Sequence, residues 1–125
     1  MEKKQKILVI EDDVYTRELY EEVLKEAGFL VETSVDGEEG IVKINEGTFD
    51  LVLLDIMMPK LDGLGVLKKL REKPAKGTEP KIVLLTNLAH DPVIKEALIL
   101  GAGSYLIKSD LNPDQLVEKV KSLLG

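Results

Sequence analysis

The sequence predicts an α/β protein in which helices cover both faces of a five-stranded parallel sheet. Five short β-rich runs alternate with segments of helical periodicity, and this alternation is typical of parallel sheets. All runs except the second read as continuously apolar, which indicates strands that are covered on both faces. We expect strands at 6–10, 29–34, 49–54, 81–85 and 104–107.

Capping residues mark the ends of the expected helices. Gly28 stands where a C-terminal glycine would end the helix expected over 13–27. Asp91-Pro92 and Asn112-Pro113 each read as an N-cap followed by proline at the first helical position, and Gln115 is placed to complete a capping box. Two more helices are expected over 36–46 and 64–72. The helix that opens at Pro92 and ends at Gly101 should carry its apolar stripe on Val93, Ile94, Ala97, Leu98 and Leu100.

Length and composition indicate one globular domain over residues 1–125. The chain has 44% hydrophobic and 32% charged residues, enough for a core and for solubility. Its longest apolar runs, such as 51–54 and 97–100, are far shorter than the roughly 20 residues of a membrane span. An acidic pair comes before any long apolar stretch, so the pattern of a secretory signal is missing and we expect a cytoplasmic protein. The net charge of −6 argues against direct binding of nucleic acid.

Chemically active side chains follow the ends of several expected strands. In a parallel sheet of this kind the ligand site lies outside the carboxyl ends of the strands. The first strand is followed by the acidic run 11–13, the third by Asp55, the fourth by Thr86 and the fifth by Lys108. Two carboxylates ~4 Å apart repel by roughly 4 kcal/mol at an effective dielectric constant of ~20. The cluster therefore requires a cation, and its oxygen ligands favour Mg²⁺.

The same side chains are suited to accepting a phosphoryl group. A carboxylate that faces Mg²⁺, with an ammonium and a hydroxyl beyond it, can attack in line while the cations neutralise the phosphoryl oxygens. Asp55 is then the nucleophile. Each of these groups, taken alone, also has a structural interpretation. An acidic pair is often a helix cap, Lys108 would be a solvated lysine, and Thr86 would be a strand-end hydroxyl. The functional reading is favoured because four strand ends present one chemistry at one edge.

These segments together resemble a known family, the receiver domain of bacterial response regulators. Residues 6–17, KILVIEDDVYTR, look like its first strand, acidic pair and following arginine, Arg17. Residues 51–63, LVLLDIMMPKLDG, resemble its phosphoacceptor segment, while VLLT at 83–86 and GAGSYLIK at 101–108 resemble its last two strands. The resemblance covers essentially the whole chain. It implies a flavodoxin-like (βα)5 fold with strand order 2-1-3-4-5 and a part in two-component signalling.

Residue by residue, the resemblance assigns the expected site. It implies that Asp55 is the phosphorylation site, Asp12 a direct Mg²⁺ ligand and Glu11 a ligand through water. The backbone carbonyl of Met57 would complete the protein's share of the metal ligands. Asp13 falls just outside the acidic pair and is interpreted as a helix-start residue.

The resemblance also implies a switch and its partners. Thr86 and Lys108 would hold phosphoryl oxygens, and Tyr105 matches the aromatic residue that turns inward when the threonine moves to the phosphate. The face formed by the fourth helix, fifth strand and fifth helix is then the bistable output surface. The donor would be a sensor histidine kinase or a phosphotransfer protein, and the output an unidentified protein target. The chain would promote its own phosphorylation without being a turnover enzyme.

Four positions depart from the family's pattern or could be misinterpreted. The family commonly has a cis-proline after the lysine, but Ser109 stands there, and we expect a trans Lys108–Ser109 bond. Met57 and Leu88 lie where the family lines the path of the hydrolytic water, and neither side chain can orient water. Slow self-dephosphorylation is therefore expected. His90 is read as a loop residue and not as a phosphodonor.

Three other classes of protein fit parts of the pattern. A flavodoxin-type FMN carrier needs a phosphate-binding loop after the first strand, where the acids of this chain would repel the ligand. A Mg²⁺-dependent aspartyl phosphatase resembles a pattern with its nucleophile at the end of the first strand and a second aspartate two residues later, a pairing not met here. The remaining alternative is a receiver-like interaction module that acts without phosphorylation, supported only by Ser109.

Overall fold

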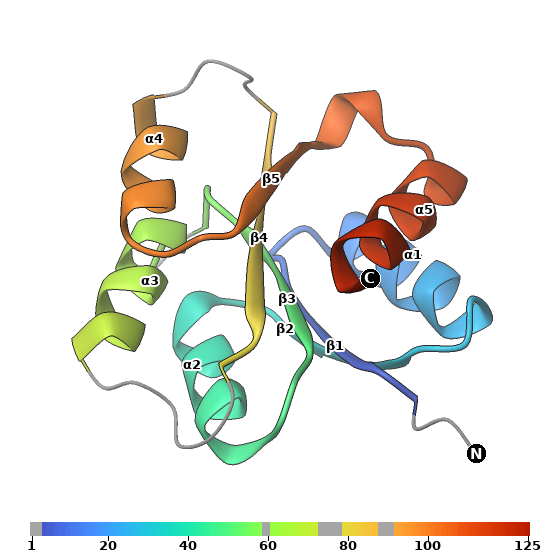
Figure 1. Ribbon diagram of the computed structural model, residues 1–125, viewed down its shortest axis with the longest axis horizontal. Helices are drawn as coiled ribbons and strands as arrows, with labels where there is room; N and C mark the ends of the chain where they lie inside the picture. Colours follow the sequence, from blue (N-terminus) through green and yellow to red (C-terminus); the bar gives the residue numbers. More distant parts are fainter. Residues whose placement is uncertain (1–3, 59–60, 73–78, 88–91) are drawn as a thin grey trace.

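The computed structural model describes residues 4–58, 61–72, 79–87 and 92–125 of the chain. Strands and helices alternate along the chain as the periodicity predicts (Figure 1). The strands are β1 Lys6–Ile10, β2 Leu30–Ser34, β3 Leu51–Asp55, β4 Lys81–Thr86 and β5 Ser104–Ile107. The helices are α1 Val14–Glu26, α2 Gly37–Glu46, α3 Gly63–Glu72, α4 Pro92–Ile99 and α5 Pro113–Leu124, and a 3-10 turn, η1 Lys108–Asp110, follows β5.

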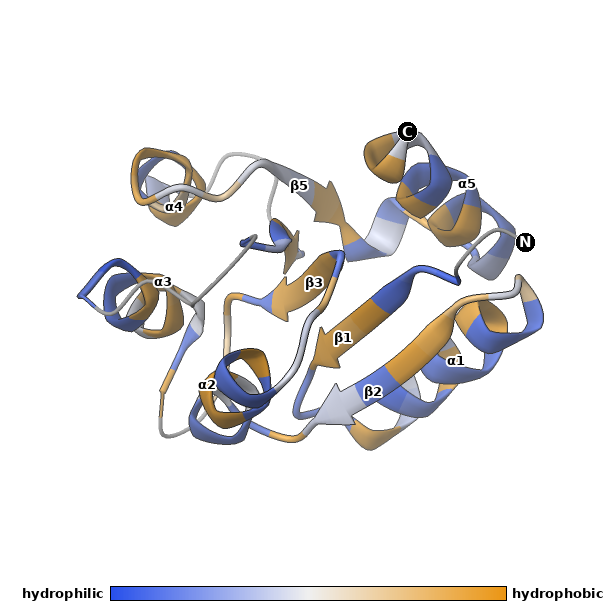
Figure 2. Ribbon diagram, turned by 60° about the horizontal axis from the view of Figure 1, so that its bottom comes forward, coloured by the Kyte–Doolittle hydropathy of each residue, from blue (hydrophilic) through white to orange (hydrophobic). Residues whose placement is uncertain are grey.

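The five strands form one parallel sheet in the order β2-β1-β3-β4-β5, which confirms the expected topology. Helices α1 and α5 lie on one face of the sheet, while α2, α3 and α4 lie on the other (Figure 1). All five residues of β3 are buried because both of its faces are covered. Figure 2 shows the same arrangement as apolar strands between helices that turn their polar sides outward. No helix in the described part of the chain is long and apolar enough to cross a membrane.

Local capping fixes where the helices begin and end. Asp13 caps α1 by accepting a hydrogen bond from the backbone N–H of Thr16 at 2.9 Å. Asn112 and Gln115 form the expected capping box at the start of α5, with distances of 2.8 and 2.9 Å. Gly28 has φ of 101°, which favours glycine, and follows the last turn of α1. The N-cap predicted at Asp91 lies outside the described residues.

The outer strand β5 and the helix beside it differ from the expected burial. Strand β5 was expected to be covered on both faces, but it closes the sheet at one edge, and Tyr105 is 39% exposed. In α4 only Ile94 and Ala97 are fully buried, so the prediction that Leu98 belongs to the buried stripe is wrong. Ile94 and Ala97 pack into the core cluster that α4 shares with α3, and Leu98, which is 41% exposed, lies outside that contact.

Close packing of α2 against the chain after β3 leads to a stability prediction. A methyl group on Gly37 would fall against the carbonyl oxygen of Leu61. We expect Gly37→Ala to lower the free energy of unfolding by about 1–3 kcal/mol, although alanine is the better helix former by up to ~1 kcal/mol. Urea unfolding measures the change. Gly103→Ala is the control, because its methyl group would lie 3.7 Å from the nearest atom; equal stability of both variants would contradict the prediction.

Candidate functional site

The topology brings the predicted site residues to one edge of the sheet. Strands β1, β3, β4 and β5 are neighbours, so their carboxyl ends lie together. Asp55 and Thr86 are the last residues of β3 and β4, and Lys108 directly follows β5. A pocket of about 490 Å³ opens there, which leaves room for an ion and a phosphoryl group. Its lining residues are Glu11, Asp12, Asp13, Asp55, Met57, Thr86, Asn87 and Lys108.

An ammonium group lies between two buried carboxylates in this pocket. Lys108 Nζ donates a hydrogen bond to Glu11 Oε1 and lies 3.2 Å from Asp55 Oδ2. The Glu11 side chain is fully buried, and the Asp55 and Lys108 side chains are 7% and 16% exposed. Lys108 therefore reaches the site across the width of the sheet, as predicted, and offsets part of the charge there.

The positive charge of Lys108 does not fully compensate the acids. Burial raises the pKa of Glu11, and the adjacent Asp55 carboxyl raises it further. Burial by itself would lower the pKa of Lys108, but its hydrogen bond to Glu11 and the charge of Asp55 outweigh burial and raise that pKa. The three clustered carboxylates outnumber the Lys108 ammonium that contacts two of them, and the Asp55 carboxyl adds to burial in disfavouring a charged Glu11. The pocket is thus electrostatically suited to a further cation.

The donor atoms fit a magnesium ion. Glu11, Asp12 and Asp55 each offer one carboxylate oxygen, and these oxygens lie within 4.8 Å of one another. Hard oxygen donors with open positions for water are what Mg²⁺ prefers. The backbone N–H of Met57 donates to Asp55 Oδ1 at 3.1 Å, which helps to fix the Asp55 carboxylate. That the Met57 carbonyl is a ligand stays a prediction.

Asp13, the third acid of the run 11–13, has a structural role. Asp13 Oδ2 accepts hydrogen bonds from the backbone N–H and the hydroxyl of Thr16, at 2.9 and 2.7 Å. These bonds lower the pKa of Asp13, so the cap carries its full charge at the N-terminus of α1. Asp13 lines the pocket but is the helix-start residue that the sequence indicated.

Arg17 is a site residue whose task the sequence did not reveal. Its Nη1 atom donates to the backbone carbonyls of Glu11 and Asp12, at 3.0 and 3.2 Å. The sequence placed Arg17 after the acidic pair but gave no sign of what its side chain binds. An arginine one helical turn after an acidic run is more easily read as a partner of acidic side chains.

The proposed switch residues lie on neighbouring strands. Thr86 is 4% exposed and pairs with Ile107, while Tyr105 is 39% exposed and pairs with Leu84. The inward turn of Tyr105 stays a prediction. No cis peptide bond occurs in the described backbone, which confirms the trans bond expected between Lys108 and Ser109. Leu88 and His90 lie outside the residues that the structure describes, so the expected slow self-dephosphorylation is untested.

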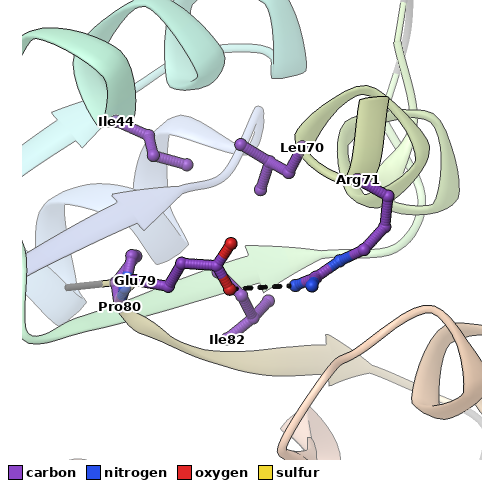
Figure 3. Close-up of a pocket in the computed structure, with 6 residues that line it drawn as sticks. All are labelled: Ile44, Leu70, Arg71, Glu79, Pro80 and Ile82. Atoms are coloured by element: carbon purple, nitrogen blue, oxygen red, sulfur yellow. Dashed lines mark hydrogen bonds and ion pairs between the residues drawn. The ribbon is translucent and has the colours of Figure 1, made fainter. Parts of the chain in front are cut away.

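A second hollow, between α2, α3 and the start of β4, lacks such chemistry. Arg71 and Glu79 form an ion pair there at 3.4 Å (Figure 3). The other side chains that line it are mainly apolar, such as Ile44, Leu70 and Ile82 (Figure 3). This hollow lies toward the amino ends of the strands, away from the acidic cluster, and reads as a packing feature.

Comparison with known proteins agrees with the geometry of the edge pocket. The family described as the response regulator receiver domain matches residues 7–121. The chain belongs to this family. Among its relatives, the chemotaxis protein CheY of Treponema pallidum is 33% identical over 95% of the chain and 82% of its own length. The probable transcriptional regulator ycf27 of Cyanophora paradoxa is 39% identical over 97% of the chain and 48% of its own length.

Solved receiver structures share the fold of this receiver domain. The response regulator TrrA of Thermotoga maritima, in complex with Mg²⁺ and beryllofluoride, aligns with a TM-score of 0.80. It is 40% identical, and the alignment covers 95% of this chain and 98% of that one. The receiver domain spans 15% of the Myxococcus xanthus gliding motility regulatory protein and about half of the transcriptional regulators that it matches.

Proposed function

We propose that this receiver domain accepts a phosphoryl group on Asp55 in a Mg²⁺-dependent reaction. The observation that carries the proposal is the position of the Asp55 carboxylate at the carboxyl end of β3. One of its oxygens faces Lys108 at 3.2 Å, and the acidic residues Glu11 and Asp12 lie beside it. The pocket in front of these groups has space for the incoming group.

The donor is proposed to be the phosphohistidine of a sensor kinase or phosphotransfer protein. A carboxylate oxygen of Asp55 forms the bond to phosphorus as the bond between phosphorus and the donor nitrogen breaks. The electron pair stays on the imidazole, which then takes a proton from solvent. Lys108 offsets the negative charge of the phosphoryl oxygens, and the Thr86 hydroxyl offers them a hydrogen bond. The domain supplies the acceptor and does not turn over an external substrate.

Glu11, Asp12 and Asp55 would hold the magnesium ion, with the Met57 carbonyl as a further proposed ligand. Bound there, the ion would neutralise part of the charge on the transferred group. The TrrA complex with Mg²⁺ and beryllofluoride supports this assignment by similarity. The three carboxylates repel one another, and Lys108 is paired with two of them, so a further cation in the cluster would relieve the remaining repulsion.

The output is proposed to pass through the surface formed by α4, β5 and α5 to a protein target in the cytoplasm. Tyr105 on β5 and Ile99 on α4 are 39% and 77% exposed there, so both side chains can contact a partner. Phosphorylation would shift Thr86 toward the phosphoryl group and give Tyr105 room to turn inward. Direct contact with nucleic acid by this domain is not part of the proposal, because its net charge is −6.

Binding of beryllofluoride, a phosphoryl mimic, tests the proposal. We expect backbone amide signals around Asp55, Thr86 and Lys108 to shift in a ¹H–¹⁵N NMR spectrum when beryllofluoride is added with Mg²⁺. Signals of β5 should shift as well if the output surface responds. Without Mg²⁺ the spectrum should stay unchanged. A spectrum that does not respond under either condition would instead favour an interaction module that acts without phosphorylation.

A further inference from the structure

The acidic loop, residues 11–13 between β1 and α1, brings two neighbouring carboxylates to the same cluster. Successive residues of a strand point to opposite faces, so Glu11 and Asp12 in an extended chain would point away from each other. In the structure both offer a carboxylate oxygen to the same cluster. The backbone must therefore leave the strand geometry between β1 and α1, and something must hold it there.

Contacts on both sides of the loop fix its ends. The backbone N–H of Glu11 donates to the carbonyl of Ser34 on β2 at 3.1 Å, which continues the pairing of β1 by one residue. Asp13 is held as the N-cap of α1 through Thr16. Between these anchors the N–H of Asp13 donates to Glu11 Oε2 at 3.3 Å, but the carbonyls of Glu11 and Asp12 belong to no strand ladder or helix.

Arg17 binds those two carbonyls. From the first turns of α1 its guanidinium reaches back, and Nη1 donates to Glu11 O at 3.0 Å and to Asp12 O at 3.2 Å. Hydrogen bonds from a charged donor are the stronger ones, and two from one nitrogen fix both peptide planes relative to each other. Arg17 is not part of the pocket lining and makes no ion pair within the described residues, so its guanidinium occupies none of the clustered carboxylate oxygens.

We propose that Arg17 is a positioning residue for the Mg²⁺ ligands, an inference that rests on the proposed magnesium site. It acts through the backbone of Glu11 and Asp12 and does not touch the ion or the phosphoryl group. Residues that orient the ligands of a metal typically account for a 10–100-fold effect on its affinity. Arg17 thus sets the metal affinity of the pocket from outside it.

An effect of the charge of Arg17 and an effect of its positioning of the ligands predict opposite changes in Mg²⁺ affinity when Arg17 is removed. If only its charge mattered, Arg17→Met would make the site more negative and Mg²⁺ would bind more tightly. If it holds the ligands in place, the same variant binds Mg²⁺ about tenfold or more weakly. Arg17→Lys keeps the charge but lacks the planar fork, and it should lie between the wild type and Arg17→Met. The sign of the change therefore separates the two explanations.

The experiment is a titration of the metal-free protein with Mg²⁺, followed by calorimetry or by amide NMR shifts. Lys25→Met is the matched control, since it removes a positive charge from an exposed site on the same helix and should bind Mg²⁺ like the wild type. The Mg²⁺ concentration that half-saturates labelling of Asp55 by acetyl phosphate should rise in Arg17→Met. The rate at saturating Mg²⁺ should fall by a smaller factor than the affinity.

The possible results of the Mg²⁺ titration separate a failure of this inference from a failure of the proposed function. If the wild type binds Mg²⁺ saturably and Arg17→Met binds it equally or more tightly, the inference that Arg17 positions the ligands is overturned. The proposed function is then unaffected. A wild type that does not bind Mg²⁺ overturns both. Should Arg17→Met fail to fold, Arg17→Lys decides: affinity equal to that of the wild type would overturn the inference, and weaker binding would support it.

Discussion

Asparagine in place of Asp55 should abolish labelling of the protein by acetyl phosphate in the presence of Mg²⁺. The substitution keeps the size of the side chain but removes the anionic oxygen that would form the bond to phosphorus. It also removes one of the three clustered carboxylates that would hold the metal. The mass of the intact protein is the measurement, because the wild type should gain one phosphoryl group and the variant none.

A neighbouring aspartate provides the matched control for this experiment. Asp13 lines the same pocket, but its carboxylate caps α1. Asparagine is an N-cap of about equal quality, so Asp13→Asn should leave the start of the helix unchanged. We expect this variant to be labelled on Asp55 like the wild type. Labelling of Asp55→Asn at the wild-type rate would rule out Asp55 as the acceptor.

Methionine in place of Lys108 should lower the free energy of unfolding in Mg²⁺-free buffer by about 3–5 kcal/mol. Lys108 is the cation that contacts both Glu11 and Asp55, and these side chains are 0% and 7% exposed. Its removal leaves two buried carboxylates side by side, and the energy of an uncompensated buried charge is much larger than that of a surface ion pair. Urea unfolding near neutral pH measures the loss.

Magnesium and a surface lysine provide the controls for the Lys108 variant. Mg²⁺ should restore part of the lost stability, because an ion that binds only the native state stabilises it and supplies positive charge to the same acids. Lys119→Met removes an exposed lysine from α5 and should change the stability by less than about 0.5 kcal/mol. If Lys108→Met were as stable as Lys119→Met without Mg²⁺, the buried cluster would not depend on Lys108.

The elements of the fold were predictable because their signals are local. The apolar run 51–54 became the central strand, and the capping box of Asn112 and Gln115 opens α5 where the sequence placed it. The exposure of Tyr105 and Leu98 was not predictable in the same way. Whether an apolar side chain is covered depends on its place in the sheet, and β5 lies at an edge.

The candidate site was likewise predictable from the sequence only in part. The sequence shows which chemical groups follow which strands, and the rule that parallel strands share one carboxyl edge brings Asp55, Thr86 and Lys108 together. It does not show how the groups pair. Lys108 contacts Glu11, which lies 97 residues earlier in the chain, and only the packing of the sheet brings the two side chains into contact.

By itself the sequence determined the α/β class, the positions of most strands and helices, and the acids, hydroxyl and lysine available for chemistry, because periodicity and capping act over a few residues. Only the tertiary structure decided that Glu11 is fully buried against Lys108 and that Arg17 holds the backbone of the acidic loop. The direction of a side chain beyond the end of a strand is set by contacts with distant segments, and no local pattern encodes those contacts.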